Sequence, residues 1–226
     1  MSARKFVLFA FFIASAAAAA DSQIDRWAAA VGGRDKLAAV KVVYREGTID
    51  AGGYHGWIKV WHTPEGRYRK EEQVGPYSNI ETYDGMTAMA QQASAPAREM
   101  AGPERARAIS SAFANWNSVF FVFFPEQRRG TMTVEDDGTI VIKPEGGIDW
   151  RITLNPQTSL PAKMIHQQGD RTVTVTFTSY ESVDGLQFEK EIHRSTGDPR
   201  FDAVIRFTKT VINPPIDKSL FTSASK

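Results

Sequence analysis

The histidines are the side chains of this chain best suited to bind a metal ion or to transfer a proton near neutral pH. There are four of them, His55, His62, His166 and His193. His55 and His62 lie in one stretch that is typical of a strand, and their odd spacing places them on opposite faces of it. Because metal ligands must converge on one point, this pair does not predict a metal site. We expect neither a metal nor a cofactor.

Motifs for nucleophilic or phosphate chemistry are absent as well. The sequence has no cysteine, no Gly-x-Ser-x-Gly, no His-Glu-x-x-His and no glycine-rich phosphate loop. Glu71 and Glu72 lie beside the basic residues of positions 67–70, a pattern typical of a solvated strand face. Asp136-Asp137-Gly138 indicates a hairpin turn, since the ligand spacing of a calcium loop is missing. The sequence therefore predicts that the protein is not an enzyme.

Aromatic side chains are the residues with the clearest capacity to hold a ligand. Residues 103–118 show helical spacing of apolar positions, and the run FFVFF follows at residues 120–124, before Pro125. Aromatic residues at helical spacing are most often core residues. The alternative is that they line a cavity for an apolar ligand, and the concentration of aromatic surface in one segment favours that interpretation.

The cavity interpretation selects a definite set of residues. Trp57, Lys59 and Trp61 share one face of a predicted strand, from which Lys59 could reach a lipid headgroup or a carboxylate. The predicted ligand-binding residues of the cavity and its lid are Trp57, Lys59, Trp61, Phe113, Trp116, Phe120, Phe121, Phe123, Phe124, Phe177 and Phe207.

The elements that must position these residues are mostly strands. Residues 172–178 read TVTVTFT, an alternation of polar and apolar residues that is typical of a strand with one buried face. Asp184-Gly185 supplies a turn to the next strand. Similar patterns predict about eleven antiparallel strands, with a broken helix over residues 21–40 and the helical segment described above. We expect an α+β, mostly β protein, in which a strongly curved sheet forms an incomplete (half) barrel with a helical lid.

The termini and the charge bear on location and partners. Residues 1–20 have the basic start, apolar core and small-residue end of a cleaved signal peptide, so residues 21–226 are expected to be a single soluble periplasmic domain. Removing two of the 27 basic residues with this segment leaves 25 against 26 acidic ones, a net charge of −1. A near-neutral surface gives no reason to expect nucleic-acid binding.

The order of several short motifs resembles that of the LolA/LolB-like superfamily, which includes outer-membrane lipoprotein-sorting proteins and lipoprotein carriers. The matching stretches are Gly32-Gly33 with Leu37, Gly47-Thr48-Ile49, Gly56-Trp57-Ile58-Lys59-Val60-Trp61 with Pro64, Glu81-Thr82-Tyr83-Asp84-Gly85, Tyr180, Val183-Asp184-Gly185, and Asn213-Pro214-Pro215-Ile216-Asp217 with Phe221. Together they extend over nearly all of residues 21–226.

The resemblance implies a function and a lid mechanism. It implies a carrier or binder of lipid or of lipoprotein acyl chains, and we expect a monomer whose partners are a lipid or a lipidated protein and an envelope membrane protein. The alternative is an envelope sensory or scaffolding module that docks a partner protein with the same curved sheet. One position departs from the family, where an arginine before the matched proline holds the lid closed. Here Thr63 precedes Pro64, which argues against a lid latch of that kind.

Overall fold

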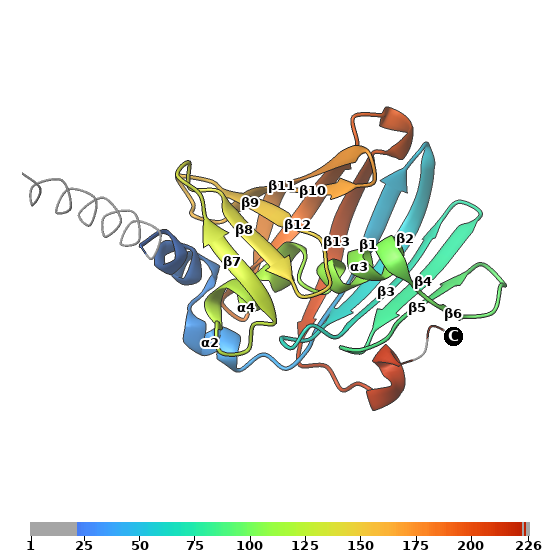
Figure 1. Cartoon of the computed structure of the whole chain (residues 1–226), viewed down its shortest axis with the longest axis horizontal. Helices are drawn as coiled ribbons and strands as arrows, with labels where there is room; N and C mark the ends of the chain where they lie inside the picture. The colour runs from blue at the N-terminus through green and yellow to red at the C-terminus, as the bar shows by residue number, and fades with distance from the viewer. Residues whose placement is uncertain (1–21, 223, 225–226) are drawn as a thin grey trace, which may run out of the picture.

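A computed structural model describes residues 22–222 and residue 224. The predicted signal peptide, residues 1–20, lies outside the described residues. One antiparallel sheet of thirteen strands dominates this part of the chain (Figure 1). Its strands are β1 (Val43–Ala51), β2 (Tyr54–His62), β3 (Tyr68–Val74), β4 (Tyr77–Tyr83), β5 (Ala88–Gln92), β6 (Arg98–Glu99), β7 (Gly130–Val134), β8 (Ile140–Pro144), β9 (Trp150–Leu154), β10 (Pro161–Gln168), β11 (Arg171–Val183), β12 (Leu186–Ser195) and β13 (Ala203–Ile212).

The helical elements are few and short. A helix over residues 22–31 is followed by α2 (Arg34–Ala38), α3 (Gly102–Ser111) and α4 (Ser118–Phe123), with 3-10 turns η1 (Asn115–Asn117), η2 (Pro199–Phe201) and η3 (Lys218–Phe221). The broken N-terminal helix is thus confirmed, and residues 120–123 of the aromatic run are helical. Among the described residues, no helix combines the length and the apolar character needed to cross a membrane.

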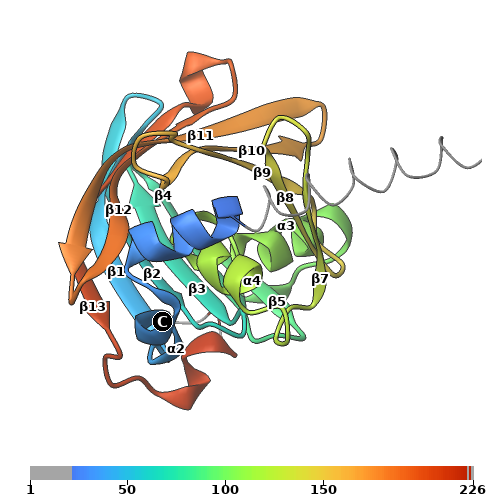
Figure 2. The same ribbon diagram turned by 90° about the vertical axis from the view of Figure 1, so that its left-hand side faces the viewer.

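The order of strands in the sheet explains how the chain makes a half-barrel. The order is β6-β5-β4-β3-β2-β1-β13-β12-β11-β10-β9-β8-β7, so each strand pairs with its sequence neighbour except where β1 meets β13. The two outermost strands, β6 and β7, are consecutive in sequence, and the segment from α3 to α4 connects them. Because strands twist, a sheet of this length curls, and Figure 2 shows it curled around the helices. The fold class is confirmed, with thirteen described strands instead of about eleven.

The alternation read from the sequence sets the two faces of the sheet. On β11, Val173, Val175 and Phe177 are buried, whereas Thr172 and Thr176 are exposed. The same period buries Ile140 and Ile142 of β8 completely. The helices pack against this inner face, and Trp27 of the N-terminal helix meets Phe123 of α4 edge to face, with ring centroids 5.0 Å apart. Burial of such aromatic pairs is a major contribution to core stability.

Candidate functional site

A cavity of about 400 Å³ lies between the inner face of the sheet and the segment formed by α3 and η1. Its apolar lining comes largely from the four central strands, β2, β1, β13 and β12. Residues of this lining are Val43, Ile49, Ile58, Val60, Ile192 and Phe207, with Trp116 of η1 opposite. Pockets for small ligands span about 300–1,000 Å³ and are mostly apolar, so size and lining fit a binding site.

The flanking strands and α3 contribute a charged part of the same cavity. Lys70 of β3 contacts two lining carboxylates, with its Nζ 2.9 Å from Glu72 Oε1 and 3.4 Å from Glu81 Oε2. Arg107 of α3 reaches Glu81 at 3.7 Å. Burial alone would lower the pKa of Lys70, but the carboxylates of Glu72 and Glu81 outweigh it and raise that pKa above its usual range. These two cations and two anions neutralise one another.

A buried ion pair in the cavity wall holds β1 against β12. Arg45 Nη1 lies 3.1 Å from Glu189 Oε2, and the side chains are only 4% and 1% exposed. The guanidinium also donates to the Glu189 carbonyl and lies 3.6 Å from the centroid of the Phe207 ring. Burial raises the pKa of the Glu189 carboxyl despite the attraction of Arg45. Because Arg45 is engaged on several sides, its role is to join strands.

Two histidines line the cavity and stay neutral there. Burial lowers the pKa of His62 to about 3, and the charge of Arg45 adds to this effect. Burial lowers the pKa of His166 in the same direction. His55, on the opposite face of β2 as predicted, is exposed. Among residues 22–222 and 224, no group of three or more histidine and carboxylate side chains is placed to hold a metal ion.

Arg194 of β12 is the remaining cationic side chain of the lining. Its Nη2 donates to Gln168 Oε1 of β10 at 3.1 Å. Within the described part of the chain it forms no ion pair with a carboxylate. Burial lowers its pKa, the charge of Glu72 acts against this, and Arg107 acts with it. A charged donor therefore stands at the cavity with a neutral amide as its partner.

Comparison with known proteins rests on structure, since the chain matches no protein-family model and no curated protein. A LolA superfamily protein from Nitrosomonas europaea superposes with a TM-score of 0.54 at 10% identity, over 90% of this chain and 97% of that one. A DUF1329 family protein from Desulfovibrio piger gives 0.53 at 13% identity, over 89% of this chain and 96% of that one.

The fold is LolA-like. The family resemblance read from the motifs is thus confirmed at the level of fold.

Within this LolA-like fold, the predicted ligand-binding residues separate into groups. Trp116 and Phe207 line the cavity. Phe121, Phe123 and Phe177 are buried in the core. Phe120 and Phe124 line a second pocket, of about 320 Å³, beside α2, while Phe113 lines a third, of about 500 Å³, with Arg105 and Arg129.

The structure places Trp57, Lys59 and Trp61 on the face of β2 opposite the cavity. The lining contains Ile58, Val60 and His62 instead. Lys59 Nζ lies over the Trp57 ring, 5.4 Å from its centroid. Lys59 therefore does not reach the cavity, contrary to the prediction. Both faces of β2 are apolar in sequence, and a shift of one residue exchanges the faces of a strand.

The charged lining was missed by sequence reasoning. The charge pattern predicts a solvated strand face for Lys70 and Glu72, yet both line the cavity together with Tyr68. Their spacing of two was a usable signal, because alternate residues of a strand share one face. This spacing does not show which face of β3 lies on the concave side of the sheet.

Thr63, which precedes Pro64, connects the end of β2 to the helical segment. The residue is 1% exposed, and its carbonyl accepts a hydrogen bond from Asn117 Nδ2 at 3.3 Å. The same amide donates to the carbonyl of Ala112. An uncharged contact thus joins the end of β2 to the helical segment.

Proposed function

We propose that this protein binds a lipid or a lipoprotein acyl chain in the cavity under α3 and η1, as a periplasmic carrier. The observation that supports this most directly is the cavity of about 400 Å³ with its apolar lining from the central strands. A methylene group is close in size to a water molecule, about 30 Å³, so the space suits on the order of a dozen of them. Each buried methylene stabilises binding by about 0.8 kcal/mol, and no catalytic group is needed.

The remaining parts of the proposal follow from the sequence and the LolA-like fold. Residues 1–20 act as an export signal and residues 21–226 as one monomeric domain that carries its ligand between envelope partners. Expression of the full chain in a Gram-negative host tests the first point, because the periplasmic product should begin at Asp21. Recovery of uncleaved chain in the cytoplasm would contradict it.

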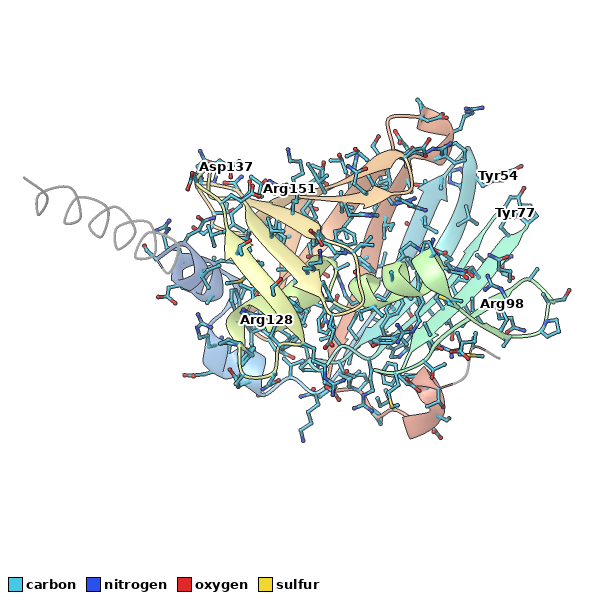
Figure 3. All side chains as sticks on the ribbon, in the orientation of Figure 1. Tyr54, Tyr77, Arg98, Arg128, Asp137 and Arg151 are labelled. Atoms are coloured by element: carbon cyan, nitrogen blue, oxygen red, sulfur yellow. The ribbon has the colours of Figure 1, made fainter. Side chains whose placement is uncertain are left out.

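The alternative, a module that docks a partner protein, has less support. The large apolar side chains that are exposed, among the described residues, are Tyr54, Tyr77, Met86, Phe201 and Ile216. Of these, Tyr54 and Tyr77 contact each other, at 6.2 Å between ring centroids, and Figure 3 shows them together at one end of β2 and β4. Such a small patch is normal for a soluble surface. The cavity is therefore the better candidate.

Uptake of a neutral apolar probe tests the proposal. We expect N-phenyl-1-naphthylamine to bind the purified protein with enhanced fluorescence, and native mass spectrometry to show bound lipid. Ser111→Trp places a bulky ring in the cavity and should weaken probe binding at least tenfold. Thr153→Trp, on the exposed face of β9, is the matched control and should bind as wild type. A folded wild type that takes up no probe, or a Ser111→Trp variant that binds normally, would refute the proposal.

A further inference from the structure

The cations of the cavity differ in how their charge is balanced. Arg45 is paired with Glu189, and Lys70 and Arg107 are balanced by Glu72 and Glu81. Arg194 has no carboxylate within ion-pair distance among the described residues. The lining histidines are held neutral by burial. Arg194 of β12 is thus the cation of the lining that has no carboxylate in direct contact, while the charges of Glu72, Asp202 and Glu81 act on it from farther away.

Arg194 also stands next to the apolar lining. Its partners across the neighbouring strands are Val175 of β11 and Ala203 of β13, and both line the cavity. Ile192 precedes it by two residues on the same face of β12. A single ligand could therefore place a polar headgroup at the guanidinium and its apolar chain against these neighbouring residues.

A partly desolvated guanidinium favours an anion. Removing a charge from water without a counter-charge is unfavourable. The planar guanidinium donates two parallel hydrogen bonds to a carboxylate or a phosphate, and the single bond to Gln168 Oε1 leaves further N–H donors for such a contact. Glu72 and Glu81 are already engaged by Lys70 and Arg107.

We propose that Arg194 binds the anionic headgroup, a carboxylate or phosphate, of an amphiphile whose acyl chain occupies the apolar part of the cavity. This inference rests on the proposed lipid-binding function and specifies the ligand class. The ligand is an anionic amphiphile, and Gln168 orients the guanidinium toward its headgroup. Lys59, on the other face of β2, takes no part.

Displacement of the neutral probe by amphiphiles of equal chain length tests the headgroup site. The competitors are dodecanoate, dodecyl phosphate and dodecyltrimethylammonium, each below its micelle concentration, and dodecanol below its solubility limit. We expect the two anions to displace the probe at concentrations at least tenfold lower than dodecanol. Acetate and inorganic phosphate, which lack the chain, should not displace it. This arm distinguishes a lipid headgroup from a free anion.

Two variants assign the preference to one side chain. Arg194→Gln should bind dodecanol as wild type does and lose the preference for the anions. Arg171→Gln removes the same charge from the neighbouring strand β11, at an exposed position outside the lining, and should keep the preference. Probe binding by each variant shows that its cavity is intact.

The outcomes separate the two proposals. If the probe binds but wild type shows no preference for anions, or if Arg194→Gln retains that preference, the headgroup site is overturned while cavity binding stands. If acetate or inorganic phosphate, without an acyl chain, displaces the probe, the site binds free anions and the headgroup proposal is overturned. If wild type takes up no probe, the proposed function fails, and the headgroup site fails with it.

Discussion

The indole of Trp116 stacks on the ring of Phe188, with centroids 4.2 Å apart and planes at 23°. The same indole donates from Nε1 to the carbonyl of Gln187 at 2.7 Å. Trp116 belongs to η1, and both partners belong to β12. This one side chain therefore fastens the helical segment to the sheet at the border of the cavity.

Replacing Trp116 should loosen this connection. We expect Trp116→Ala to lower the free energy of unfolding by about 3–5 kcal/mol, the usual cost of removing a large buried aromatic, and to weaken probe binding. Urea unfolding measures the first effect. Trp61→Ala, at a half-buried position on the outer face of β2, is the control and should cost less. Equal losses in the two variants would contradict the assigned role.

Breaking the Arg45–Glu189 pair should destabilise the fold strongly. Arg45→Met leaves a buried carboxylate without its partner, and Glu189→Leu leaves a buried guanidinium; each should cost about 3–5 kcal/mol. The double variant removes both charges and should lose less than the sum of the two single losses. A double-mutant cycle in urea provides the measurement. Additive losses would show that the two charges do not interact.

His62 should make stability depend on pH. Its pKa is about 3 in the folded protein and about 6.5 in an unfolded chain. Between these values the unfolded chain binds a proton that the folded protein does not, so stability falls as the pH decreases from about 6.5 towards 3, by up to about 1.4 kcal/mol per pH unit. His62→Gln removes this contribution. Its stability should decline less than that of wild type between pH 7 and pH 5, and parallel curves would count against the buried histidine.

The two glycines after the N-terminal helix should differ in their tolerance of a side chain. Both have positive φ, 122° at Gly32 and 96° at Gly33. A Cβ at Gly32 would lie 2.3 Å from the carbonyl oxygen of Gly185, whereas one at Gly33 would meet nothing within 4 Å. Gly33→Ala should therefore cost about 1–3 kcal/mol for backbone strain alone, because φ 96° with ψ 150° is a region that residues with a Cβ rarely adopt. Gly32→Ala should cost several times more in thermal or urea unfolding, and similar values would contradict the close approach.

Several features could be predicted from the sequence because they depend on neighbouring residues. The alternation at residues 172–178 predicts which side of β11 is buried, and Asp184-Gly185 predicts the turn that follows, where both residues have positive φ. Gly32-Gly33 predicts the break in the N-terminal helix. The order of these local patterns along the chain predicts a curved antiparallel sheet with a helical lid. It also carries the resemblance to the LolA/LolB-like superfamily.

The tertiary structure alone decided which residues reach the cavity. Both faces of β2 are apolar in sequence, so periodicity could not choose between Trp57 and Ile58; the curl of the sheet made Ile58 the inner residue. Lys70, Glu81 and Arg194 come from β3, β4 and β12, and curling brings their side chains to one cavity. Local sequence fixes the period of a strand, whereas the direction in which a sheet bends depends on twist and packing summed over all of its strands.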